Sequence, residues 1–299
     1  MIFLKKMVFT VLDGENEMEL KNWFRLKGIS TRSVTRLKYY GSILLNGKNV
    51  TVREKIAMGD VIELHFADDE KSATPEALPL SILYEDSCVL VLDKPPQMPT
   101  HPSKKLQSGT LANAFAYYMQ SKGKPHSFRP INRLDRGTSG LVVAALDPLS
   151  AGKLSGKVDK RYICVCRGEI AENGTIDAPI ALENGSKIKR CVSPDGQRAV
   201  THFKRLFANG HISVAEVSLE TGRTHQIRVH FANMGNALIG DTLYGEADET
   251  INRQALHCIS VSFTHPITNE QISVKGELPS DIIHLLKENN ATDFINLLQ

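Results

Sequence analysis

The chain has 299 residues and a formal net charge of +3, and its 41% hydrophobic and 23% charged residues are typical of a globular protein. No stretch is apolar over the ~20 residues that a membrane-spanning helix needs, so we expect no membrane association. Residues 1–7 lack a signal-peptide layout, and the five cysteines include no pair at zinc-binding spacing. We therefore expect a cytoplasmic protein with one large and one small domain.

Residues 1–66 have the pattern of a small mixed domain. A short strand is predicted at 7–14 and a helix at 19–27. A second helix is opened by Ser30 or Thr31 and ended by Gly41. A hairpin with a tight turn at Asn46-Gly47 and an alternating strand at 61–66 follow. This order, with its Gly-x-Ile-x-x-Asn-Gly hairpin, resembles the RNA-binding module named after ribosomal protein S-four.

The same region is strongly basic. From residue 21 to residue 53 the chain has eight lysines and arginines and no acid, which favours a polyanionic partner over a mixed-charge surface. Arg32 and Arg36 lie one helical turn apart, a spacing that suits backbone phosphates. The alternative is a small α/β domain with a helix that is basic by chance. The RNA-binding residues that we expect here are Arg25, Lys27, Arg32, Arg36 and Lys38.

An acidic, proline-containing segment at 67–80 is predicted to be a linker, so that residues 81–299 form the large domain. Two strands are predicted at 82–86 and 88–93, before a proline-rich exit that begins at Lys94. A helix is expected from Thr110 through Tyr118.

The most informative stretch is residues 129–141. One carboxylate, Asp135, lies among Arg129, Arg133 and Arg136, just before an apolar run at 141–146 that is typical of a buried strand. Nearby positive charge favours the ionised carboxylate, which can act as a nucleophile or general base toward a polyanion. For an isolated Asp-Arg pair, a structural ion pair in a turn would be the better interpretation.

The whole string favours catalysis. Arg-Leu-Asp-Arg-Gly-Thr-Ser-Gly-Leu at 133–141 resembles the catalytic motif of the RluA-type pseudouridine synthases. The string Glu-Asp-x-x-Val-Leu-Val-Leu-Asp-Lys-Pro at 85–95 resembles their first motif, whose role there is mainly structural. The chain departs from the family at Asn132, where a histidine is usual. Either residue can hydrogen-bond locally, but a role of that histidine does not carry over.

A helix is predicted at 148–158 and a strand at 160–166. Lys160-Arg161-Tyr162 at the start of that strand resembles the family's second site motif, which implies that Tyr162 stacks on the target base. Without the resemblance, a tyrosine packed in the core would be the better interpretation. A basic loop at 182–198 is expected near the RNA, and strands are predicted at 199–203 and 211–219.

Thr-Gly-Arg-Thr-His-Gln-Ile-Arg-Val-His at 221–230 is a second string of the family, a loop that leads into a helix with Thr224 as a possible N-cap. We reject a zinc site at His225 and His230, since side chains five residues apart on a helix diverge and no carboxylate flanks them. The resemblance implies that Arg228 pairs with Asp135 and that Ile227 lines the pocket. Gly240-Asp241-x-Leu243-Tyr244-Gly245 and the helical residues at 279–299 are interpreted as architecture.

The resemblance implies an α+β fold. Its catalytic domain has a mixed, mostly antiparallel sheet with flanking helices, beside the small α/β module; the strands lack regular βαβ alternation. It also implies isomerisation of uridine to pseudouridine in structured RNA after base flipping. Asp135 is then the catalytic group and Arg133 fills the position that the base leaves. No metal or organic cofactor is implied, and a monomer is expected.

Two other functions compete with this one. A non-catalytic RNA-binding or ribosome-assembly factor would lack the aspartate or its arginine, and both are present. An RNA methyltransferase would need a Gly-x-Gly cofactor loop after a strand, and the sequence has none. The N-terminal module favours large-subunit ribosomal RNA as the substrate, with transfer RNA as the alternative.

Overall fold

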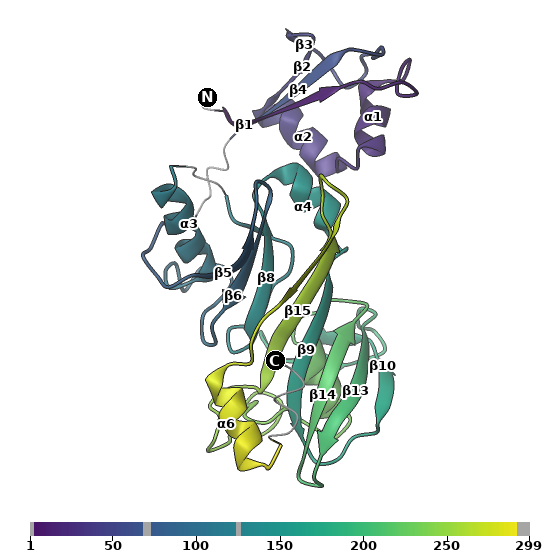
Figure 1. Ribbon diagram of the computed structural model, residues 1–299. Helices are drawn as coiled ribbons and strands as arrows, with labels where there is room; N and C mark the ends of the chain where they lie inside the picture. Colours follow the sequence, from purple (N-terminus) through teal and green to yellow (C-terminus); the bar gives the residue numbers. More distant parts are fainter. Residues whose placement is uncertain (1–2, 68–72, 124–126, 292–299) are drawn as a thin grey trace.

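The computed structural model describes residues 3–67, 73–123 and 127–291, and Figure 1 shows two units stacked end to end. The first unit has a four-stranded sheet in the order β1-β4-β2-β3, with two helices packed against it. Its elements are β1 (Phe3–Thr10), α1 (Leu20–Leu26), α2 (Thr31–Tyr40), β2 (Ser42–Leu45), β3 (Lys48–Asn49) and β4 (Val61–Ala67).

These elements follow the predicted order with one shift. The first strand ends at Thr10 rather than residue 14, because a turn begins near Asp13 and Gly14. The second helix starts as expected: the Ser30 side chain accepts a hydrogen bond from the backbone N–H of Ser33 at 3.1 Å, which caps the helix.

The second unit is built on a ten-stranded sheet in the order β10-β13-β14-β9-β15-β8-β6-β5, with β16 beside β15 and β7 beside β8. Every pair is antiparallel except β15 with β8, so the expected mixed, mostly antiparallel sheet is confirmed. The sheet strands are β5 (Ser81–Glu85), β6 (Val89–Lys94), β7 (Arg129–Pro130), β8 (Ser139–Ala145), β9 (Asp159–Arg167), β10 (Asn173–Asp177), β13 (Val200–Ala208), β14 (Ile212–Leu219), β15 (Leu256–Thr264) and β16 (Gln271–Lys275).

The remaining elements lie around this sheet. A separate hairpin pairs β11 (Ile180–Leu182) with β12 (Arg190–Val192). The helices are α3 (Leu111–Ser121), α4 (Pro148–Leu154), α5 (Gln226–Asn233) and α6 (Ser280–Glu288). The helix predicted at 148–158 is too long, because α4 ends at Leu154. Of the helical segments predicted at 279–299, α6 accounts for 280–288, and residues 292–299 lie outside the described residues. No helix of the described chain is long and apolar enough to span a bilayer.

The central strands are buried on both faces. Along β9, Tyr162 and Cys164 belong to a large core shared with α3 and α5, whereas Ile163 and Val165 belong to a second core shared with α6. Neighbouring residues of a strand point to opposite faces, so this alternation places Tyr162 on the face covered by α5. The sheet therefore fixes the position of Tyr162 relative to the helix that carries Arg228.

The two units contact each other through α4, which lies directly below α2 in Figure 1. Leu149 of α4 is buried in the apolar core of the N-terminal unit, beside Trp23 and Phe24. The predicted linker at 67–80 begins with Ala67, the last residue of β4, and residues 73–80 are also described. These residues are held at the start of α3: Asn113 donates to the carbonyl of Thr74 at 2.8 Å, and Glu76 accepts from the backbone N–H of Gly109 at 2.7 Å.

Candidate active site

Asp135 lies in the loop that connects β7 to β8, and this loop is fastened at both ends. Asn132 donates to the carbonyl of Leu141 at 3.0 Å and accepts from the N–H of Val143 at 2.9 Å. Its carboxamide thus continues the hydrogen-bond ladder along β8, so the residue that departs from the family pattern has a local structural role. Further along, Thr100 donates to the carbonyl of Leu134 at 2.9 Å.

The glycines of the motif are required by close contacts. Gly140 has a φ of +108°, and a Cβ there would lie 2.3 Å from the carbonyl oxygen of Cys258 on β15. A side chain would therefore both strain the backbone and separate the one parallel strand pair of the large sheet. The Gly-containing end of the motif lets β15 approach β8 just behind Asp135.

Lys94, the lysine of the first motif, is fully buried beneath the loop. Its ammonium group donates to the carbonyls of Pro95 at 2.9 Å, Met98 at 2.8 Å and Arg136 at 3.3 Å. Burial lowers the pKa of Lys94 to about 7. Lys94 therefore joins the proline-rich exit of β6 to the residue after Asp135, which agrees with the structural role expected for this motif.

The partner of Asp135 comes from α5, 93 residues further along the chain. Arg228 donates from Nη1 to Oδ2 of Asp135 at 3.1 Å, which is the pairing that the resemblance implies. This contact comes from α5 rather than from the arginines that neighbour Asp135 in sequence. Arg136 donates to the carbonyl of Gln97 at 3.2 Å, and Arg133 is exposed.

Arg228 is itself held by a second carboxylate. Asp241 accepts two hydrogen bonds from its guanidinium, at 2.7 and 2.8 Å, and both side chains are almost fully buried. Although burial lowers the pKa of Arg228, its pairs with Asp241 and Asp135 outweigh burial and raise that pKa. We interpreted Asp241 as architecture from the sequence; it is the group that fixes the arginine facing Asp135.

The start of α5 differs from the prediction. His225, not Thr224, occupies the N-cap position, and its φ of +59° turns the chain sharply into the helix. Gln226 accounts for the difference, because its side chain accepts from the hydroxyl of Thr221 at 2.8 Å and from the N–H of Arg223 at 2.9 Å. The polar contacts of Gln226 hold the loop, so no capping side chain is needed.

His225 is a site residue that we interpreted from the sequence only as a rejected metal ligand. Its Nε2 lies 3.7 Å from Oδ2 of Asp135, and its Nδ1 is 2.8 Å from the hydroxyl of Tyr244. Burial lowers the pKa of His225. Tyr244 also places its ring 5.0 Å from the guanidinium carbon of Arg228. His225 and Tyr244 each lie in a string that follows the family pattern, Thr-His-Gln and Leu-Tyr-Gly. Nothing in the sequence indicates that these two strings are in contact.

The two histidines that invited a metal interpretation belong to separate networks. Whereas His225 faces Asp135, His230 is buried and contacts the Thr201 hydroxyl and the Ala178 carbonyl, both at 2.9 Å. Among the described residues, one group of possible ligands lies within 4.8 Å: Asp86, Cys88 and His265. This group is at the β5–β6 turn and lines no part of the Asp135 pocket.

Asp135 opens into a small pocket of about 60 Å³. Its walls are the ring of Tyr162, which is 5% exposed, and the apolar side chains of Ile227 and Leu256; Arg133 lies at the rim. Burial raises the pKa of Tyr162 well above its usual value, so the phenol stays neutral. The predicted residues Asp135, Tyr162, Arg133, Arg228 and Ile227 therefore line one pocket, which combines apolar side chains with a carboxylate.

The N-terminal basic residues lie in the other unit. Arg25 and Lys38 are exposed, whereas Lys27 is partly buried, forms an ion pair with Glu15 and lies 5.4 Å from the ring centre of Trp23. Arg36 is partly buried on α2. Arg32 is part of the same helix, but its side chain lies outside the described residues.

The segment of the chain that carries this site matches a known family. Residues 88–233 match the family model described as RNA pseudouridylate synthase. A Bacillus subtilis protein named "Uncharacterized RNA pseudouridine synthase YjbO" is 42% identical over 91% of this chain and 100% of its own length. The chain belongs to the RNA pseudouridine synthase family. It is accordingly an isomerase that converts uridine in RNA to pseudouridine.

Other relatives of this synthase agree. "Ribosomal large subunit pseudouridine synthase D" of Xanthomonas campestris is 35% identical over 84% of this chain and 83% of its own. Among solved structures, "Human RNA Pseudouridylate Synthase Domain Containing 1" superimposes with a TM-score of 0.54 at 25% identity, covering 68% of this chain and 85% of that chain. The pseudouridine synthase fold that we expected is thereby confirmed.

Proposed function

We propose that this pseudouridine synthase modifies large-subunit ribosomal RNA, with Asp135 as its catalytic carboxylate. The observation that carries the residue assignment is the ion pair between Asp135 and Arg228 at the mouth of a pocket walled by Tyr162. The substrate is supported by relatives named as large-subunit enzymes, which match more than four fifths of this chain in Xanthomonas campestris and Vibrio cholerae.

The proposed reaction moves the uracil from an N1–C1′ bond to a C5–C1′ bond. The base must first leave the helical stack, because a stacked uridine is out of reach of an enzyme pocket. Asp135 then acts either as a nucleophile at C1′ or as a base on the sugar, and Arg228 holds the carboxylate oriented toward the pocket. Since Asp241 fixes Arg228 by two hydrogen bonds, little reorganisation is needed when the RNA arrives.

The other pocket residues have roles in binding the flipped nucleotide. Tyr162 offers an aromatic face to the uracil, a contact of about 1–3 kcal/mol per base, and Ile227 excludes water on the opposite side. Arg133 is exposed at the rim, where its planar guanidinium can stack and hydrogen-bond in the position that the base has left. The pocket thus separates base recognition from the charged chemistry at Asp135.

The N-terminal unit, which resembles the S-four module, would bind RNA outside the pocket through the exposed basic side chains of α1 and α2. Phosphate contacts of this kind add affinity and orient the enzyme without reading the base sequence. Leu149 anchors the unit on the large one, so the basic surface and the pocket would approach one RNA together.

Pseudouridine mapping of total RNA tests this function. RNA from a strain that lacks the gene is compared with RNA from the same strain complemented with the wild type or with Asp135→Asn. We expect one or a few large-subunit sites to disappear and to return only with the wild type. Lost sites in transfer RNA alone would overturn the proposed substrate, and restoration by Asp135→Asn would overturn the role of Asp135.

A further inference from the structure

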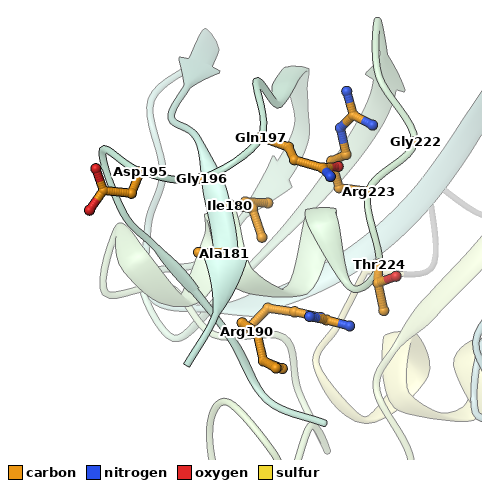
Figure 2. A pocket seen from close by; sticks show the side chains of 10 residues that line it. Ile180, Ala181, Arg190, Asp195, Gly196, Gln197, Gly222, Arg223 and Thr224 are labelled. Atoms are coloured by element: carbon orange, nitrogen blue, oxygen red, sulfur yellow. The ribbon is translucent and has the colours of Figure 1, made fainter. Parts of the chain in front are cut away.

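A second and larger pocket lies beside the one that holds Asp135. Its volume is about 360 Å³, roughly six times that of the Asp135 pocket, and it is formed by the β11–β12 hairpin, the turn at 195–197 and the loop at 222–224 (Figure 2). Arg223 lines both pockets, so the two cavities adjoin. This second pocket is separate from the space that a flipped uracil would enter beside Asp135.

The lining of this pocket is positively charged and carries no aromatic ring. Arg190 extends from β12 toward Thr224, and Arg223 lies above it (Figure 2). The Nε of Arg190 is buried and has no hydrogen-bond partner among the described residues, whereas that of Arg223 donates to the carbonyl of Arg198 at 3.0 Å. Asp195 is the one carboxylate of the lining, and Figure 2 shows it on the opposite side of the pocket.

A chain of contacts joins Arg190 to the catalytic carboxylate. The backbone N–H of Arg190 donates to the hydroxyl of Tyr244 at 2.9 Å, and that oxygen lies 2.8 Å from Nδ1 of His225. The Nε2 of His225 is in turn 3.7 Å from Asp135. Two residues, Tyr244 and His225, therefore link Arg190 to Asp135, and the charge of Arg190 is among the causes that lower the pKa of His225, after burial.

We propose that this second pocket binds a backbone phosphate next to the target uridine, with Arg190 as its main ligand and Arg223 at the boundary between the two pockets. The lining has no aromatic face for a base, and Arg190, whose Nε has no partner among the described residues, presents N–H donors in a fork that matches a phosphate. The phosphate would set how far the flipped nucleotide enters the Asp135 pocket. Arg190 is thus a positioning residue, and its role rests on the proposed function.

The test uses a ribosomal RNA fragment that carries a mapped uridine. Single-turnover pseudouridine formation is measured below saturation, at several salt concentrations, for the wild type, Arg190→Gln, Arg190→Lys and the control Lys275→Gln. Lys275 is exposed on β16 and lines neither pocket, so its substitution removes the same charge outside both. The fragment is also made with one uncharged methylphosphonate linkage at each position around the uridine in turn.

We expect Arg190→Gln to lower kcat/KM about 10- to 100-fold, the range for a lost charged hydrogen bond, and to reduce the salt slope by about 0.7–0.9. Arg190→Lys should recover part of this loss, and Lys275→Gln should change the rate less than about 2-fold, as is usual for a general surface charge. One methylphosphonate should slow the wild type but not Arg190→Gln.

Equal rates for Arg190→Gln and Lys275→Gln, or the absence of any linkage that couples to Arg190, would overturn the phosphate site while the wild type remains active. An inactive wild type would instead overturn the proposed substrate. Thermal unfolding of each variant separates a folding defect from lost binding, and a folded Arg190→Lys keeps the comparison decisive.

Discussion

Two polar networks in the large domain contain an aspartate, a histidine and a tyrosine, and they differ in how completely the aspartate is satisfied. At the β5–β6 turn, Oδ2 of Asp86 accepts from the Tyr84 hydroxyl at 2.6 Å and from His265 at 2.8 Å. Its Oδ1 accepts from the N–H groups of Cys88 at 2.7 Å and Val89 at 2.8 Å. Both oxygens of this carboxylate are therefore fully used within the protein.

Asp135 has far fewer partners. One oxygen accepts a 3.1 Å hydrogen bond from Arg228 and lies 3.7 Å from His225, and the other makes no hydrogen bond within the described part of the chain. The polar donors and acceptors around it bond to one another instead: Asp241 holds Arg228, and Tyr244 holds His225. The carboxylate is thus oriented by groups that leave one of its oxygens open to the pocket.

The comparison separates a carboxylate whose oxygens are all hydrogen-bonded from one that keeps an oxygen open to a pocket. Buried polar groups in folded proteins are nearly all hydrogen-bonded, so a carboxylate that lines a pocket with an open oxygen is a candidate for chemistry. The residue types alone do not distinguish the two networks. Four variants, taken from the largest expected effect to the smallest, test this difference. We expect a carboxylate with an open oxygen to affect the reaction, and a fully hydrogen-bonded one to affect stability.

Asp135→Asn should lower the rate of pseudouridine formation at least about 1000-fold, because an amide cannot serve as the nucleophile or base. The free energy of unfolding should change by less than about 1 kcal/mol, since Asp135 accepts one hydrogen bond and is partly exposed. Single-turnover kinetics and urea unfolding measure the two effects. RNA affinity by filter binding is the control and should stay within a few-fold of the wild type; retained turnover would remove Asp135 from its role.

Asp241→Asn should lower both the free energy of unfolding and the rate of pseudouridine formation. Its side chain is 1% exposed and that of Arg228 is 9%, so the substitution leaves a buried guanidinium short of a charged partner. Breaking such a pair costs about 3–5 kcal/mol of stability. The kcat of the folded fraction should also fall, because Arg228 is no longer fixed against Asp135.

Asp281→Asn is the matched control for Asp241. Asp281 also holds an arginine with two hydrogen bonds, at 2.7 and 2.8 Å to Arg253, but it is 31% exposed. Arg253 keeps its bond to the Gly137 carbonyl at 2.9 Å when Asp281 is replaced. Because the Arg253 side chain is only 1% exposed, we expect a loss of stability comparable with that of Asp241→Asn but a normal kcat. An unchanged kcat in Asp241→Asn would contradict the orienting role of that pair.

Asp86→Asn tests the satisfied network. Although burial raises the pKa of Asp86, hydrogen bonds from Tyr84, Cys88 and Val89 lower it to about 2. A folded-state pKa below the ordinary 3.8 means that the carboxylate stabilises the fold above about pH 4 and loses this contribution as the pH falls toward 2. The shift corresponds to about 2 kcal/mol.

Urea unfolding between pH 7 and pH 3 measures this contribution. The wild type should exceed Asp86→Asn by about 2 kcal/mol at pH 7, and the gap should narrow below pH 4. The kcat of the folded variant should equal that of the wild type, since Asp86 is remote from the pocket. A gap that is constant with pH would show that the cost comes from lost shape rather than lost charge.

Residues near one another in sequence were predicted well, because local patterns determine them. The alternation of β9, the Ser30 cap and the Asn46-Gly47 turn each follow from a few neighbouring side chains. The pairing of Asp135 with Arg228 could be expected only through the family resemblance, since 93 residues separate them. Sequence periodicity carries no information about which loop meets which helix.

The missed parts of the site depend on tertiary packing. Asp241 lies 13 residues beyond Arg228, past the end of α5, and Tyr244 reaches His225 because that histidine adopts a left-handed conformation that its residue type does not require. Similarly, Lys27 counts as a basic residue in sequence, but folding brings Glu15 against it. A charge pattern shows which groups are present and not which of them are already paired.

The difference between exposed cations and cations already paired within the N-terminal unit leads to the smallest of the predicted effects. Lys38→Gln and Arg25→Gln each remove an exposed cation from the N-terminal unit, whereas Lys27→Gln removes one that is already paired with Glu15 and packed on Trp23. If the unit binds RNA phosphates, each of the first two should weaken binding about 2- to 5-fold and reduce the salt slope by less than 1.

Lys27→Gln should leave the salt slope unchanged and lower stability instead, because its partly buried partner Glu15 loses an ion pair. Although burial raises the pKa of Glu15, hydrogen bonds from Lys27 and Trp23 lower it. RNA affinity measured against salt concentration for the three variants distinguishes the two kinds of cation. A change of slope in Lys27→Gln alone would mean that the ion pair opens on RNA binding, so that pairing within the protein does not predict which cations meet RNA.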